Sequence, residues 1–318
     1  MPDTILKRVS NVLRRAVAPR NGPIILMYHR VGSPICDPER LAVTPENLKQ
    51  QIEVLKEKRT VVPLAWLADR LARGLPVEGT AVVTFDDGYA DTFHQGLPIL
   101  SALDCPATVF LATGFIGTGS NMWWDILARL FFLPGVLPPQ VRIDTLHRPI
   151  AIDGTSAKSR TLTYRRIADL VRRLPSPERD AIVCDLARQI RGNLEDLESD
   201  RLMTPDEVIR WHSKGMFDVG AHTVTHPSLP ALPDRYKASE IEDSCRTCTD
   251  LIGDAPAGFA YPYGNYDAST ISSVIAARVD MAVTTEKRTV SRNESPFKLP
   301  RYYVGNWNGE EFAKTIRF

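Results

Sequence analysis

The stretch AVVTFDDG, residues 81–88, joins an apolar run to two adjacent carboxylates, Asp86 and Asp87, and a glycine. A short apolar run that ends in a turn signal is typical of a buried β-strand. Asp-Asp-Gly is also common in ordinary turns, so the stretch needs support from other segments. Two neighbouring carboxylates repel each other unless a cation or a hydrogen-bond donor offsets their charge, which makes a charged site at this strand end an attractive hypothesis.

On both sides of this stretch, short apolar runs alternate with longer helical patterns, as in a parallel sheet with crossover helices. Thr204, Pro205 and Glu207 form a capping box with proline at the first helical position, and Thr44 with Pro45 repeats half of that device. Polar residues at the carboxyl ends of such strands often form active sites. The predicted strands are 24–28, 81–85, 107–112, 217–221, 258–261 and 280–284, and the predicted helices are 45–58, 92–103, 204–214 and 234–252.

Another apolar run, residues 217–221, is followed by two histidines, His222 and His226. Their spacing would place both rings on one face of a helix, but Pro227 biases His226 away from helical dihedrals, so we expect a loop or short turn. One His-x-x-x-His is by itself a weak signal of a metal site. Combined with an aspartate at another strand end, it forms a set of two histidines and one carboxylate with open positions for water and substrate.

Two more predicted strand ends carry candidates. His29 directly follows the run at residues 24–28, and we interpret it as a candidate proton donor, although a lone histidine is more often structural. Residues 259–264 read Phe-Ala-Tyr-Pro-Tyr-Gly and could turn a backbone amide, that of Tyr263, towards the same edge of the sheet. Several aromatic residues near these segments could stack on a substrate, but most are expected to be ordinary packing. They are Tyr89, Trp123, Trp124, Tyr261, Tyr266 and Trp307.

These four segments together resemble the polysaccharide deacetylases of the NodB type, which are metal-dependent hydrolases that remove acetyl groups from sugars. Residues 84–88 match the first motif of that family as they stand, and residues 222–226 match the second. The occurrence of both motifs in this order is highly specific. The resemblance covers residues 23–116 and 204–305.

The resemblance implies an α/β fold, a distorted (β/α) barrel of seven strands with a mainly helical insertion. It also implies that Asp86 is the catalytic base and that Asp87, His222 and His226 hold a divalent metal, for which zinc is the expected ion. The metal and the backbone amide of Tyr263 would then stabilise the oxyanion.

The family's usual late Leu-x-His motif is absent, because no histidine follows His226. Residues 26–29 carry a similar pattern near the other end of the chain. This order is similar to the circularly permuted branch that includes poly-N-acetylglucosamine deacetylases, in which the strand bearing the acid comes first. On that resemblance, His29 is the general acid that protonates the leaving amine.

A second departure concerns the third motif, in which alanine, Ala260, stands where the family has an arginine. That arginine keeps the catalytic aspartate ionised and oriented. We predict that Arg301, which follows Leu299 and Pro300, takes over this task, although a surface arginine would explain the residue equally well. If residues 302–304 form a barrel strand, Arg301 lies at its amino end, away from the chemistry.

The expected organisation is a basic amphipathic helix over residues 1–21 and a deacetylase-like barrel over residues 22–318, interrupted by an insertion at about 118–203. Residues 4–18 of the helix place apolar side chains on one face and could touch an anionic membrane surface, but packing on the domain is the more common role of such a helix.

The composition excludes several classes of protein. Lys plus Arg number 39 and Asp plus Glu 38, giving a net charge of +1, so no nucleic-acid partner is expected. No run of about 18 apolar residues and no secretory signal is present, so we expect a cytoplasmic protein, in contact with the inner membrane face if residues 4–18 bind there. The five cysteines do not indicate a disulfide framework.

The expected function is hydrolysis of the N-acetyl group of an amino-sugar polysaccharide or a glycan precursor, with an acetylated amino-sugar glycan as partner. Two alternatives stay open. A related amide hydrolase could act on a small cyclic amide or a formylated lipid-linked sugar, because the motifs describe the reaction centre rather than the substrate. An inactive sugar-binding domain is the other, suggested by Ala260.

Overall fold

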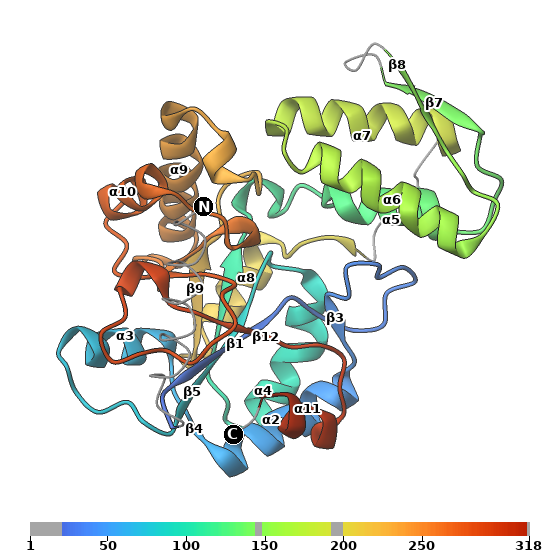
Figure 1. Ribbon diagram of the computed structural model, residues 1–318. Coiled ribbons are helices and arrows are strands. Elements are labelled where there is room, and N and C mark those ends of the chain that lie inside the picture. The colour runs from blue at the N-terminus through green and yellow to red at the C-terminus, as the bar shows by residue number, and fades with distance from the viewer. Residues whose placement is uncertain (1–20, 144–147, 192–199, 317–318) are drawn as a thin grey trace, which may run out of the picture.

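The computed structural model describes residues 21–143, 148–191 and 200–316, and a curled parallel sheet forms its centre (Figure 1). Seven strands follow one another in the order β11, β10, β9, β6, β5, β1, β12, and an eighth, β4, pairs with the start of β5. Every pairing in this sheet is parallel. The strands are β1 (Ile24–Tyr28), β4 (Thr60–Val61), β5 (Thr80–Phe85), β6 (Ala107–Leu111), β9 (Phe217–Ala221), β10 (Phe259–Ala260), β11 (Ala282–Val283) and β12 (Tyr302–Tyr303).

One short segment before and within β12 joins the two ends of the sheet. Leu299 bridges to Val283 of β11, while Tyr302 and Tyr303 pair with Leu26 and Met27 of β1. The backbone of Leu299 also donates to Ala282 O at 2.9 Å. The sheet therefore curls into the distorted (β/α) barrel that the sequence predicts.

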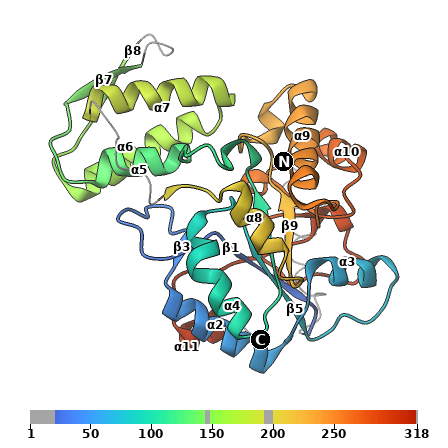
Figure 2. The same cartoon turned by 180° about the vertical axis from the view of Figure 1, so that it is seen from behind.

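Helices cover the outside of this barrel (Figures 1 and 2). Thr44 caps α2 by accepting from Asn47 N, and Thr204 with Glu207 forms the predicted capping box of α8. Both helices begin with a proline whose fixed φ suits the first turn. The helices are α2 (Pro45–Lys58), α3 (Leu64–Ala72), α4 (Leu97–Ala102), α8 (Pro205–His212), α9 (Asp234–Ile252), α10 (Ala268–Ala276) and α11 (Gly309–Ile316).

The predicted helix over residues 92–103 is interrupted. It begins as a π-helical turn, η1 (Thr92–Gly96), and continues as α4. The predicted strands at 258–261 and 280–284 shrink to the two-residue strands β10 and β11. Pro262, which has no backbone N–H to donate, limits the extension of β10.

The insertion stands beside the barrel as a separate layer (Figures 1 and 2). It consists of α5 (Trp123–Phe132), the antiparallel hairpin β7 (Gln140–Ile143) and β8 (Arg148–Ala151), α6 (Ala157–Val171) and α7 (Ser176–Arg191). Its helices bury their own apolar core, distinct from the core inside and around the barrel. A further pair of short strands, β2 (Arg30–Val31) and β3 (Ala42–Val43), flanks a loop that reaches towards this layer.

The amphipathic helix predicted at residues 1–21 lies almost entirely outside the described residues, so it stays a prediction. Within the parts of the chain that the structure describes, no helix has the length and apolar character needed to cross a membrane.

Candidate active site

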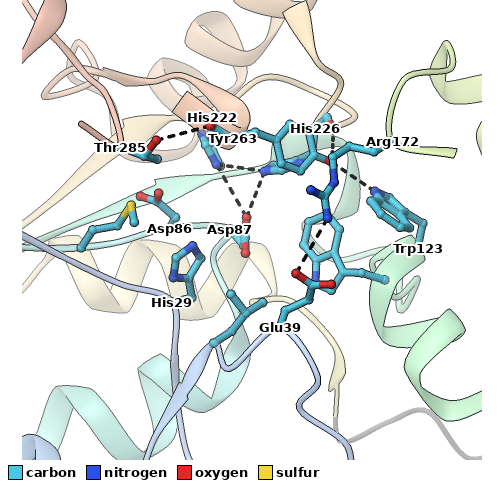
Figure 3. Close-up of a pocket in the computed structure, with 13 residues that line it drawn as sticks. His29, Glu39, Asp86, Asp87, Trp123, Arg172, His222, His226, Tyr263 and Thr285 are labelled. Carbon is cyan, nitrogen blue, oxygen red and sulfur yellow. Dashed lines mark hydrogen bonds and ion pairs between the residues drawn. The ribbon is translucent and has the colours of Figure 1, made fainter. Parts of the chain in front are cut away.

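The reactive side chains gather at the carboxyl ends of three barrel strands (Figure 3). His29 follows β1, Asp86 and Asp87 follow β5, and His222 follows β9. These strands are neighbours or near neighbours in the sheet, so residues that are remote in sequence meet at one edge. They line a cavity of about 140 Å³.

Asp87, His222 and His226 form a compact, fully buried group whose ligand atoms all lie within 4.8 Å of one another. The two Nε2 atoms are 3.1 Å apart, and they lie 3.6 and 3.4 Å from Asp87 Oδ1. Ligands 2.0–2.1 Å from a tetrahedral ion are about 3.3–3.4 Å from each other, so this spacing fits zinc. Asp87 Oδ1 has no hydrogen-bond partner among the described residues, which leaves it available to a cation.

The protonation states of this group also fit a metal. Burial lowers the pKa of His222 and, further, that of His226, so both rings are neutral and can donate a lone pair. Burial and the neighbouring charge of Asp86 raise the pKa of Asp87 well above its usual value. A buried carboxyl with a raised pKa regains its charge when a cation binds beside it.

Backbone contacts orient both histidines. Nδ1 of His222 lies 2.7 Å from Ala260 O, which directs Nε2 into the cavity, an arrangement common among metal-binding histidines. His226 ends a tight turn rather than a helix, as Pro227 predicts, and its φ of 55° lies in the left-handed region. Glu240 secures that turn by accepting from the backbone of Val224 and Thr225, each at 2.8 Å.

Asp86 has a different partner. Arg301 donates to both of its carboxylate oxygens at 2.7 Å and also to Thr84 Oγ1 at 3.1 Å. The arginine is fully buried. Burial raises the pKa of Asp86, but the charge and hydrogen bonds of Arg301 outweigh this effect, so the pKa falls below its usual value. The structure thus brings together Asp86 and Arg301, the two residues that were paired as a prediction from sequence.

Arg301 reaches Asp86 although it precedes a strand. Tyr302 pairs with Leu26 of β1, so the Cα of Arg301 lies low in the barrel, as the sequence analysis anticipated. Its side chain rises through the interior instead of pointing to solvent, and Nε donates to Thr284 O at 3.0 Å on the way. Only a long side chain at this position can reach the carboxyl end of β5, where Asp86 lies.

His29 lines the same cavity on the side opposite His226 (Figure 3). Burial lowers its pKa to about 4, partly offset by the charge of Asp86. Its Nδ1 is buried and has no hydrogen-bond partner among the described residues. His29 is therefore neutral and faces the same cavity as Asp86.

Tyr263 lines the cavity, and its side chain packs against the metal-site histidine His226. Its φ is 58°, and its ring packs edge-on against His226 at 4.7 Å between centroids. The hydroxyl accepts from Trp123 Nε1 at 3.3 Å and donates to His226 O at 3.4 Å. A role of the Tyr263 amide in oxyanion stabilisation stays a prediction.

The other wall residues are not among the predicted catalytic residues and metal ligands. Trp123 and Trp124 come from the insertion, and the ring of Trp124 packs 4.8 Å from that of His226. Arg179, also from the insertion, donates to Thr225 O at 3.0 Å and His226 O at 3.3 Å. Sequence reasoning identified the two tryptophans only as general candidates for stacking. The wall residues that it missed are Met27, Glu39, Leu41, Arg172 and Thr285.

Comparison with known proteins agrees with this geometry. Residues 75–282, more than half of the chain, match the polysaccharide deacetylase family. YxkH of Bacillus subtilis (strain 168), named for polysaccharide deacetylase activity, is 28% identical over 295 residues, covering 92% of this chain and 75% of that protein. The poly-β-1,6-N-acetyl-D-glucosamine N-deacetylase of Escherichia coli (strain K12) is 33% identical over 91 residues, but these span only 28% of this chain and 14% of that protein.

Among solved structures, IcaB from Ammonifex degensii superposes with a TM-score of 0.61 at 16% identity, over 93% of this chain and 96% of that one. At this identity the likeness establishes the fold. The family match, supported by the two motifs at the strand ends, establishes the relationship. The chain therefore belongs to the polysaccharide deacetylase family, hydrolases that act on carbon–nitrogen bonds other than peptide bonds.

Proposed function

We propose that this deacetylase is metal-dependent and hydrolyses the N-acetyl group of an amino-sugar polysaccharide or glycan precursor. The observation that carries the proposal is that two adjacent carboxylates have different partners. Asp86 is held by Arg301, whereas Asp87 faces two histidine nitrogens. Neighbouring acids in such different surroundings can act as base and ligand side by side.

Asp87, His222 and His226 would hold the ion, and zinc suits two imidazoles and a carboxylate with open positions. When bound, the ion supplies Lewis acidity towards the acetyl carbonyl and acidifies the attacking water. The rest of the chemistry belongs to side chains of the chain itself.

Asp86 takes a proton from the water that attacks the acetyl carbon, and Arg301 keeps the carboxylate ionised and directed for this step. His29 protonates the amine as the carbon–nitrogen bond breaks. Because the pKa of His29 is lowered to about 4, it must first gain a proton, and protonated Asp86 is the neighbouring donor. One acetamide and one water are consumed, and one acetate and one protonated amine are released.

The substrate assignment has two supports. The E. coli relative is named for N-deacetylation of poly-β-1,6-N-acetyl-D-glucosamine, although the match spans a small part of it. The cavity wall carries the aromatic side chains of Trp123 and Tyr263, which suit the apolar face of a sugar ring. The contact of Arg301 with Asp86 also removes the reason that Ala260 offered for an inactive sugar-binding domain.

The test is acetate release from N-acetylglucosamine oligomers by the zinc-loaded protein, with formate release from N-formyl sugars and ring opening of cyclic amides measured in parallel. We expect acetate release, and its loss after chelation with recovery on adding zinc. Preference for a formylated or cyclic substrate would assign the related amide hydrolase instead. Zinc content of the purified protein, compared with that of Asp87→Ala, tests the metal separately.

A further inference from the structure

The mouth of the cavity is spanned by a charged pair that the chemistry above does not use (Figure 3). Glu39 comes from the loop between β2 and β3, and Arg172 caps the carboxyl end of α6 in the insertion. Both line the cavity that holds Asp86 and Asp87. Two parts of the molecule that are remote in sequence thus place a carboxylate and a guanidinium at the entrance to the proposed reaction centre.

The two side chains form an ion pair but no hydrogen bond. Arg172 Nη2 is 3.8 Å from Glu39 Oε2, which exceeds hydrogen-bond length, and each side chain is 33% exposed. The other oxygen of the carboxylate is anchored, because Tyr164 donates to Glu39 Oε1 at 2.8 Å. Glu39 is therefore held in place with one acceptor directed at the guanidinium and at the cavity.

Arg172 is also held in place, and its guanidinium keeps N–H donors that bind no other residue described by the structure. Its guanidinium lies over the ring of Tyr263, 5.3 Å from the centroid. Its Nε is buried and has no hydrogen-bond partner among the described residues. The guanidinium makes no hydrogen bond to the described residues, so the donors of its terminal nitrogens at the cavity remain for a ligand.

The pair does little to fasten the insertion to the barrel. A partly exposed ion pair at 3.8 Å contributes little to stability. Buried contacts perform that task, namely the ion pair of Arg30 with Asp200 at 2.8 Å and the hydrogen bonds of Arg179 to the His226 turn. The placement of Glu39 and Arg172 needs another explanation.

We propose that Glu39 and Arg172 form a sugar subsite that holds the hydroxyl groups of the amino sugar while its acetamide occupies the cavity. This inference rests on the proposed function and names the part of the site that selects a sugar. Each hydroxyl both donates and accepts, so it matches a carboxylate acceptor beside a guanidinium donor, and charged partners strengthen both bonds. Trp123 and Tyr263 offer aromatic surface to the ring. A carboxylate or phosphate on the substrate would bind Arg172 but be repelled by Glu39, which favours a neutral sugar.

The test compares two substrates on the zinc-loaded enzyme, an N-acetylglucosamine oligomer and an activated aryl acetate that has no sugar hydroxyls. Glu39→Gln and Arg172→Met should each lower kcat/KM for the oligomer about 10- to 100-fold, mainly through KM, the loss expected for a hydrogen bond to a charged group. Hydrolysis of the aryl acetate should change less than about twofold. Arg172→Lys should recover part of the loss, and Arg165→Met, an exposed arginine on the same helix, should behave as wild type.

Equal losses on both substrates would overturn the subsite, because the pair would then support the reaction centre. Tighter binding of an acidic oligosaccharide by Glu39→Gln, together with poor binding of the neutral oligomer by wild type, would assign an anion site instead. If wild type cleaves the aryl acetate but not the oligomer, the proposed function fails while the subsite remains measurable. Inhibition of aryl acetate hydrolysis by the oligomer, weakened in Glu39→Gln and Arg172→Met, would still support it, and unchanged inhibition would reject it.

Discussion

The barrel and the insertion contribute to the cavity in different ways. The barrel supplies the groups to which we assign proton transfer and metal binding, because His29, Asp86 and His222 directly follow strands β1, β5 and β9. The insertion supplies walls and supports from helices that have their own core, among them Trp124 and Arg179. The reaction centre thus depends on strand ends, whereas substrate access and support depend on how a second layer docks.

Buried charges form the junction between these regions. Arg30, next to His29 on the barrel, pairs with Asp200 at 2.8 Å, and Arg129 of α5 pairs with the same carboxylate at 2.5 Å. Trp124 donates to Tyr89 OH at 2.8 Å, and that hydroxyl donates to Asp125 at 2.6 Å. The residues after β5 are therefore connected to the insertion by hydrogen bonds. Substitutions in the barrel test the proposed catalytic groups, and substitutions in the insertion test the residues that support them.

The largest effect is expected on the barrel side, from loss of a metal ligand. Asp87→Ala, His222→Ala and His226→Ala should each lose most of the bound zinc and all measurable acetate release, because three ligands leave no redundancy. Asp86→Asn serves as the matched control. It should keep its zinc but lose about 10²- to 10⁴-fold in turnover, the usual contribution of a general base. Full zinc content in all three ligand variants would refute the assignment.

The next effect concerns His29. His29→Ala should lower turnover on an N-acetyl sugar about 10²- to 10⁴-fold while zinc content and the unfolding midpoint stay unchanged. An aryl ester should suffer far less, because its leaving group needs no proton. Rates on both substrates check this, and equal losses would point to a structural role.

A smaller effect, visible in pH dependence, is expected from Arg301. The catalytic base must be ionised, so activity declines as the pH falls through the pKa of Asp86. Arg301 holds that pKa below its usual value against the effect of burial. Arg301→Ala should therefore raise the pKa of Asp86 and move the acidic limb of kcat/KM to higher pH. Arg301→Lys should restore only part of the shift, because the two-pronged contact is lost.

Zinc content and the circular dichroism spectrum are the controls for Arg301, since removing one partner of a buried pair destabilises proteins by roughly 3–5 kcal/mol. An acidic limb that stays in place in both folded variants would mean that Arg301 does not set the ionisation of Asp86.

The smallest effect on turnover is expected on the insertion side. Arg179 is 1% exposed and holds two successive carbonyls of the His226 turn. Arg179→Ala should weaken zinc binding about 10- to 100-fold, as for other partners that orient metal ligands, while saturating zinc restores most activity. A competing chelator measures the affinity. The control is Arg188→Ala, which changes a 73% exposed side chain on the same helix. Equal zinc affinities in the two variants would show that Arg179 does not support the metal site.

Much of the reaction centre could be predicted from sequence because its signals are local. An apolar run followed by Asp86 and Asp87, and another followed by His222, report strand ends whatever the rest of the chain does. Parallel strands in one sheet then bring these ends to the same edge. The helix starts at Pro45 and Pro205 were predictable for the same reason, since caps act within one turn.

The contact of Arg301 with Asp86 was only a hypothesis from sequence, because it depends on the closure of the sheet through residues 299–303 and on the path of one long side chain. Glu39 and Arg172 gave no sequence signal at all, since their meeting requires a loop and a separately packed insertion to dock across the cavity. The strands and the reactive residues that end them can be predicted from sequence, because periodicity and turn chemistry are short-range signals. The cation that accompanies Asp86 and the residues that form the cavity mouth depend on packing between distant segments, so they are known only from the folded structure.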